Sequence, residues 1–252
     1  MKKVTRFVLQ MIALITMTID HSGKLFLTYK SVPFELCFII GRIAFPLFCF
    51  MIAEGARHTR NIWKYLARIL VFAVLIESFF FIYTCFFDGI YKITLNVFFS
   101  LALGLLTIAL IKNPKWYIKI MVIIPLALLF TCDVYVKQIV LLGTIFPVRF
   151  EYSFYGIFLM LWFYLFDKRW VQALGMIIAT FLFCQYGLFY HLGMPSFYIM
   201  GYYQIFGLLV IPLILMYNGK VGRIKLPRYF MYLYYPIHML AIYGIYILIH
   251  LL

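Results

Sequence analysis

Four ionisable side chains interrupt long apolar runs in this sequence: Asp20, His21, Arg42 and Glu77. A histidine can accept a proton from a reacting group, and a carboxylate can hold that histidine in the required tautomer. A guanidinium can stabilise negative charge that develops during a reaction. Together these side-chain types predict a proton-transfer site, with His21 as the general base and Asp20 or Glu77 as its partner.

The composition shows in what surroundings such a site must lie. Of the 252 residues, 66% are hydrophobic and 12% are charged, whereas soluble domains contain roughly 45–50% apolar and 25% charged residues. This excludes a water-soluble domain. It predicts an all-α fold, a polytopic integral membrane helical bundle in which residues 1–252 form a single transmembrane domain.

The helices that position the site follow from the apolar runs. A bilayer core about 30 Å thick requires about 20 apolar residues per helix. The runs predict nine spans, at 7–28, 36–56, 62–84, 92–111, 116–132, 152–166, 170–190, 203–217 and 229–251. The stretch 133–150 is apolar in its middle but too short to cross, so we expect a re-entrant or interfacial segment there.

The net charge of +14 is distributed unevenly between the loops. If the N-terminus is cytoplasmic, sixteen Lys and Arg residues fall on the inner side and five on the outer side, and Arg42 lies within a span. This bias follows the positive-inside rule. It predicts a multi-pass plasma-membrane protein with its N-terminus in the cytoplasm and its C-terminus outside, and it requires no nucleic-acid partner.

The four ionisable residues share one level of this arrangement. At about 1.5 Å per helical residue, each is placed about 10 Å below the outer surface, although successive helices run in opposite directions. Ionisable groups inside a span cost roughly 2.5–3.5 kcal/mol each, so their retention at one depth predicts a shared polar site. A structural role stays open, in which Asp20 and Glu77 pair with Arg42 and only fix helix packing.

Two further spans contribute polar side chains. Asn96, Ser100 and Gly104 recur at i, i+4 and i+8, which forms a small polar stripe on one helical face. The last span contributes Tyr235 and His238, although His238 could serve only as a hydrogen-bond donor between helices. The five cysteines form no CxxC pair or Cys/His cluster, so the sequence predicts no metal site.

Six blocks of the sequence, in this order, resemble the signature blocks of the TraX family: TMTIDHSG (16–23), GRIAFPLFCFMIAEG (41–55), LNVFFSLALGLL (95–106), EYSFYG (151–156), LMYNGKVG (215–222) and YLYYPIH (232–238). The namesake of this family acetylates the N-terminus of F pilin, and the family is similar to the wider transmembrane acyltransferases. The resemblance spans essentially the whole chain. One departure is visible, because Glu151 and Ser153 stand where the family more usually has Asp and Gly.

The resemblance implies an acetyltransferase that passes an acetyl group from cytoplasmic acetyl coenzyme A (acetyl-CoA) to an amine or hydroxyl at the outer side. Such a transfer needs a base for the acceptor proton and donors near the developing oxyanion. We expect His21, or alternatively His238, as the base, and Arg42 or Asn96 opposite the thioester carbonyl. The candidate coenzyme-binding residues are Asn218, Lys220, Arg223 and Arg228, and the candidate acceptor-binding residues are Glu151, Tyr155 and Tyr235.

Two other classes of function stay open at this stage. A proton-coupled transporter or flippase could use the same Asp, Glu, Arg and His side chains as a relay, although no inverted repeat is visible. A noncatalytic scaffold for a secretion or conjugation assembly is the third interpretation. For the enzyme, the predicted partners are the lipid bilayer, acetyl-CoA, an exported peptide, sugar or lipid-linked acceptor, and a second copy of the chain in a homo-oligomer.

Overall fold

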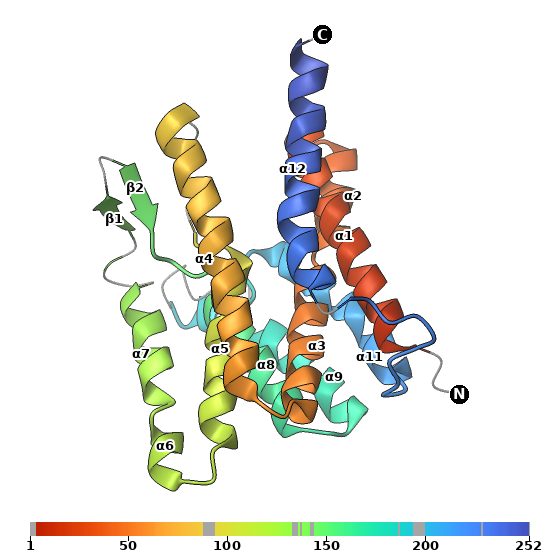
Figure 1. The fold of residues 1–252 in the computed structure, drawn as a ribbon. Helices are drawn as coiled ribbons and strands as arrows, with labels where there is room; N and C mark the ends of the chain where they lie inside the picture. The colour runs from red at the N-terminus through yellow and green to blue at the C-terminus, as the bar shows by residue number, and fades with distance from the viewer. Residues whose placement is uncertain are drawn as a thin grey trace.

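The computed structural model describes residues 4–87, 94–132, 136, 138–141, 144–185, 187–193, 200–227 and 229–251. Its elements are α1 (Arg6–Phe26), α2 (Val32–Gly41), α3 (Ala44–His58), α4 (Ile62–Phe87), α5 (Val97–Lys112), α6 (Trp116–Ile120), α7 (Ile123–Thr131), β1 (Gln138–Leu141), β2 (Thr144–Pro147), α8 (Ser153–Leu165), α9 (Arg169–Phe183), α10 (Leu188–His191), the 3-10 helix η3 (Tyr202–Val210), α11 (Ile211–Met216) and α12 (Phe230–Leu251) (Figure 1). Helices therefore dominate the described residues, as the composition predicted.

Polar residues next to the apolar runs fix where several helices begin. The Thr5, Ser31 and Asn96 side chains accept hydrogen bonds from the first turns of α1, α2 and α5. Such caps satisfy backbone N–H groups that have no partner within the helix. A short turn at Arg42 and Ile43 separates α2 from α3, so the predicted second span is a broken helix.

Each of the nine predicted spans contains helix, but the helices differ in length. Among the residues that the structure describes, three helical segments are long and apolar enough to cross a membrane: Val32–His58, which comprises α2, the turn and α3, together with Ile62–Ile82 and Phe230–Ile249. Shorter apolar helices occupy much of the remaining predicted segments, such as Val97–Lys112 and Ser153–Leu165. These helices are typical of a membrane protein, and the full count of nine crossings stays a prediction.

The helical bundle contains one short β element that the sequence did not predict. Within the stretch 133–150, β1 and β2 form a two-stranded antiparallel sheet in which Ile139 pairs with Phe146. Residues 133–135, 137, 142 and 143 lie outside the described part. Pairing two short strands satisfies backbone groups of an apolar segment that is too short to span the bilayer. The re-entrant or interfacial position of this stretch stays a prediction.

Helix α3 lies at the centre of the bundle. Most of its residues are buried, including Leu47, Phe50 and Ala53, and it contacts α1, α5, α8 and η3. By contrast α4 and α12 expose many large apolar side chains, as a lipid-facing helix does. In Figure 1 the α3–α4, α5–α6 and α8–α9 connections lie together at the lower end, and the C-terminus lies at the upper end.

Candidate functional site

A pair of histidines joins the first and last helices. His21 Nδ1 of α1 and His238 Nε2 of α12 are 2.8 Å apart and share a hydrogen bond. Near them, the hydroxyls of Thr18 and Tyr234 are also 2.8 Å apart, which fixes the register of α12 on α1. The sequence singled out both histidines but gave no indication that they contact each other, since 217 positions separate them.

The second hydrogen bond of His238 determines which nitrogen of His21 is basic. His238 Nδ1 lies 2.8 Å from the backbone carbonyl oxygen of Tyr234, and a carbonyl can only accept, so His238 carries its proton on Nδ1. The neutral ring then presents a lone pair on Nε2, which accepts from His21 Nδ1. This leaves the lone pair of neutral His21 on Nε2. In the neutral pair the Tyr234 carbonyl thus sets both tautomers and leaves Nε2 as the nitrogen of His21 that carries a lone pair.

Asp20 and Arg42 form the ion pair that their equal depth suggested. Arg42 Nη2 donates to Asp20 Oδ1 at 3.2 Å, and Lys24 Nζ donates to Asp20 Oδ2 at 2.6 Å. Asp20 packs directly against Gly41, where a β-carbon would have no room. The guanidinium also lies over the Phe38 ring, 4.2 Å from its centroid. Asp20 therefore holds α1 against the α2–α3 turn in addition to any role beside His21.

Glu77 and Asn96 form a second buried group, between α4 and the start of α5. The backbone N–H and the Nδ2 of Asn96 donate to Glu77 Oε2 at 2.8 and 2.7 Å. Asn96 Nδ2 also donates to the Ala73 carbonyl, and its Oδ1 accepts from the N–H of Phe98. Both residues are almost fully buried. Because the amide of Asn96 already caps α5, its role here is to orient Glu77 and the helix.

Two of the three candidate acceptor-binding residues, Glu151 and Tyr155, lie at the start of α8. Ser100 Oγ donates to the carbonyl oxygen of Glu151, and Glu151 interacts electrostatically with Arg42. The Tyr155 hydroxyl accepts from Gln204 Nε2 at 3.3 Å and is buried between α8 and η3. Glu151 therefore belongs to the polar group around Arg42, whereas Tyr155 bonds to η3.

Tyr235 lies between the histidine pair and a cavity that we name the main cavity. Its ring packs edge-on against His21 at a centroid distance of 5.9 Å and against His238 at 5.5 Å. The ring also lines a cavity of about 590 Å³. That cavity extends between α1, α3, α4, α5 and the segment before α12, and its apolar wall includes Met17, Met51, Ile69 and Leu101.

Basic side chains line the other part of this cavity: Arg6, His58, Arg68 and Lys225. Among the residues that the structure describes, Arg68 Nε is one of two buried side-chain nitrogen or oxygen atoms without a hydrogen-bond partner. An unpaired buried guanidinium N–H is costly and indicates a site for an anion. The sequence assigned Arg6 and Arg68 only to the positive-inside bias, because charge counting cannot show which loop residues face a cavity.

The predicted coenzyme-binding residues follow α11. Asn218 Oδ1 accepts from the N–H of Lys220, and the N–H of Asn218 donates to the Val4 carbonyl. The turn that they form is hydrogen-bonded to residues 4–7, next to the basic part of the cavity. Arg223 lies in the same exposed loop, and Arg228 lies outside the described residues. Within the described part of the chain no group of three or more His, Cys, Asp and Glu side chains could hold a metal ion.

The family model described as TraX protein matches residues 5–246, which is almost the whole chain. The chain belongs to the TraX family. The protein named "Probable fimbrial assembly protein FimC, serogroup H1" from Dichelobacter nodosus is 32% identical over 247 residues, which cover 92% of each chain. No solved structure matches this TraX-family chain.

Proposed function

We propose that this TraX-family protein is a membrane-embedded acetyltransferase that moves an acetyl group from cytoplasmic acetyl-CoA to an amine or hydroxyl at the outer side of the membrane. The observation that carries this proposal is the cavity of about 590 Å³ that leads from basic side chains to Tyr235. On the other side of the Tyr235 ring lies the His21–His238 pair. The cavity proposed for a phosphate-bearing donor thus lies next to the proposed base.

The lining of the cavity suits the two ends of such a donor. Arg68 and Lys225 can bind phosphate oxygens, and the unpaired Nε of Arg68 gives one such contact a fixed direction. The apolar wall along Met51, Ile69 and Leu101 suits the pantetheine arm. The volume of about 590 Å³ falls within the range of small-molecule sites.

The chemistry proposed for the histidine pair follows from its tautomers. The acceptor amine or hydroxyl attacks the thioester carbonyl, and its proton passes to Nε2 of His21. The C–S bond then breaks, coenzyme A leaves as a thiolate, and that thiolate recovers the proton. Asn96 has both amide hydrogens engaged, so of the two groups considered for the thioester oxyanion we propose Arg42. One of its Nη groups is bonded to Asp20, and the guanidinium fork carries further donors.

The acceptor that we propose is an exported peptide, most simply a fimbrial or pilin-type subunit. The support is the name of the relative, which concerns fimbrial assembly. A sugar or a lipid-linked acceptor would require the same base, so the structure of the base does not distinguish between them.

The experiment that tests the enzyme uses the purified protein in detergent and acetyl-CoA with a labelled acetyl group. We expect labelled product and free coenzyme A to form in equal amounts when a peptide with a free N-terminus is supplied. Mass spectrometry of the peptide measures the added acetyl group. A transporter or a scaffold would form neither the labelled product nor free coenzyme A. If neither forms with peptide, sugar and lipid-linked acceptors, the proposal is contradicted.

We also propose that the chain crosses the membrane nine times, with its N-terminus in the cytoplasm and its C-terminus outside. The support is the positive-inside bias together with the shared location of the α3–α4, α5–α6 and α8–α9 connections (Figure 1). A cysteine introduced at Lys115 should react with an impermeant maleimide only from the cytoplasm, and one introduced at Leu192 only from outside. Reaction of both positions from the same side would show that the number of crossings between them is wrong.

A further inference from the structure

A second, smaller cavity adjoins the main cavity, which is the proposed donor site. It has a volume of about 270 Å³ and is lined by Arg6, Leu9, Phe50, Met51, Glu54, His58, Tyr217, Gly219 and Val221. Four of these residues also line the main cavity: Arg6, Met51, His58 and Val221. The two cavities therefore adjoin each other at these four side chains.

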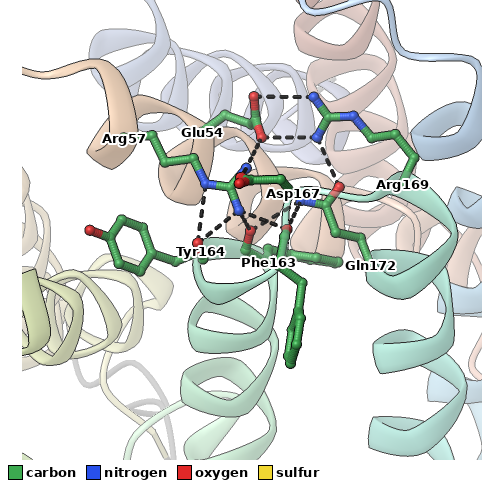
Figure 2. A network of polar contacts seen from close by, with 8 residues as sticks. Glu54, Arg57, Phe163, Tyr164, Asp167, Arg169 and Gln172 are labelled. Atoms are coloured by element: carbon green, nitrogen blue, oxygen red, sulfur yellow. Dashed lines mark hydrogen bonds and ion pairs between the residues drawn. The ribbon is translucent and has the colours of Figure 1, made fainter.

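The acidic wall of the side cavity is held in place by two arginines. Glu54 Oε1 accepts from Arg57 Nη1 and from Arg169 Nη1, each at 2.9 Å (Figure 2). Among the residues that the structure describes, Glu54 Oε2 has a long contact with Arg169 Nη2, at 3.4 Å. The Glu54 carboxylate is thus fixed and charge-compensated, and Oε2 keeps most of its capacity to accept a hydrogen bond from a ligand.

The side cavity also has an aromatic wall. Phe50 and Tyr217 pack edge to face at a centroid distance of 5.3 Å. The guanidinium of Arg169 lies over both rings, at 5.3 Å from Phe50 and 4.9 Å from Tyr217. A flat heteroaromatic ring is the kind of group that packs well against such rings.

A cation stands where the two cavities meet. Arg6 lines both of them and interacts electrostatically with Tyr65 of the main cavity and with Tyr217 of the side cavity. His58 lines both cavities as well. An anionic group at this junction would lie between the acidic and aromatic walls on one side and the donor cavity on the other.

We propose that the side cavity binds the adenine ring of the coenzyme, with its ribose 3′-phosphate at the junction beside Arg6 and His58. This proposal rests on the proposed function, because it extends the donor site. The 6-amino group of the purine donates to Glu54 Oε2, and the ring packs against Tyr217, which the fully buried Phe50 supports from within the bundle. The remaining phosphates then lie toward Arg68 and Lys225, and the pantetheine arm follows the apolar wall toward Tyr235.

Isothermal titration of the purified wild-type protein tests the subsite without any variant. The probes are adenosine 3′,5′-bisphosphate, adenosine 5′-diphosphate, which has no 3′-phosphate, and inosine 3′,5′-bisphosphate, which has a carbonyl in place of the 6-amino group. We expect the first probe to bind about 10- to 100-fold more tightly than either of the others, as for the loss of one hydrogen bond to a charged group. Equal affinity for all three probes would overturn the assignment.

A pair of variants tests the junction. Arg6→Met should weaken binding of adenosine 3′,5′-bisphosphate by about 10-fold or more, while Lys64→Met should leave it unchanged, because Lys64 is exposed and lines neither cavity. Equal binding by both variants would remove Arg6 from the site. Melting curves show whether each variant is folded.

The two proposals fail in different ways. Nucleotide binding with these preferences but no acetyl transfer would support the subsite and contradict the enzyme. The second outcome compares acetyl-CoA with acetyl-dephospho-CoA, which lacks the 3′-phosphate. Transfer from both donors at the same rate and with the same KM would support the enzyme and overturn the subsite.

Discussion

Replacing His21 by alanine is expected to lower the rate of acetyl transfer by about 100- to 10,000-fold, which is typical of a lost general base. The physical reason is that a methyl group cannot accept the acceptor proton, whereas Nε2 of His21 carries a lone pair when His238 is protonated on Nδ1. Binding of coenzyme A should stay close to wild type, because His21 is not among the residues that line the donor cavity. Single-turnover transfer from labelled acetyl-CoA, with binding measured on the same preparation, gives both numbers.

The control for this variant is His191→Ala. His191 is an exposed histidine in α10, outside the candidate site, so its removal should leave both transfer and binding unchanged. His238→Ala should give a smaller loss than His21→Ala, since His238 orients the base without taking the acceptor proton. A wild-type rate in His21→Ala together with an inactive His238→Ala would transfer the role of base to His238.

Replacing Arg57 by methionine is expected to lower the free energy of unfolding by about 3–5 kcal/mol, as when one partner of a buried ion pair is removed. Arg57 is mostly buried and donates to Glu54 and to the carbonyl oxygens of Phe163, Tyr164 and Phe166 (Figure 2). Those carbonyls belong to the last turn of α8 and the residue after it, where the helix has no further N–H groups to donate to them. The measurement is unfolding of the purified protein in detergent, followed by heat or by denaturant.

Two further variants separate charge from geometry at this position. Arg57→Lys keeps the positive charge but not the planar fork of donors, so it should recover only part of the loss. Arg60→Met removes a charge from the same connection, where Arg60 is exposed, and should change stability by less than about 0.5 kcal/mol. If Arg57→Met melts like Arg60→Met, the contacts in Figure 2 contribute little to holding α3, α8 and α9 together.

The depth of the polar residues could be predicted from the sequence, but their pairing could not. Counting residues from the ends of the apolar runs placed Asp20 and Arg42 at one level, and the structure joins them in an ion pair. The same counting left Glu77 as a possible partner of Arg42 or His21, whereas its contacts described here are with Asn96. Depth follows from the helical rise, but the partner depends on how each helix is rotated about its axis, which packing decides.

The same distinction, between what position along the chain determines and what packing decides, explains which parts of the fold could be predicted. Hydropathy located the helices, because an apolar run in lipid must satisfy its backbone internally. It did not separate α2 from α3 at Arg42, or predict that part of the stretch after α7 pairs as β1 and β2. The cavity was also invisible in the sequence, since Arg6, Arg68 and Lys225 come from segments far apart in the chain and meet only through packing.

The hydrogen bonds between residues 4–7 and residues 216–221 have a consequence for biogenesis. Val4, Arg6 and Phe7 donate from their backbone N–H groups to the Met216, Lys220 and Val221 carbonyls, so a segment that is synthesised early is joined to one that is synthesised much later. His21 likewise obtains its partner only when α12 arrives. The first helix must therefore wait in the membrane, with Asp20 and His21 already inserted, until α12 supplies Tyr235 to the main cavity and His238 to the histidine pair. A chain that stalls before α12 would carry His21 without the partner that sets its tautomer.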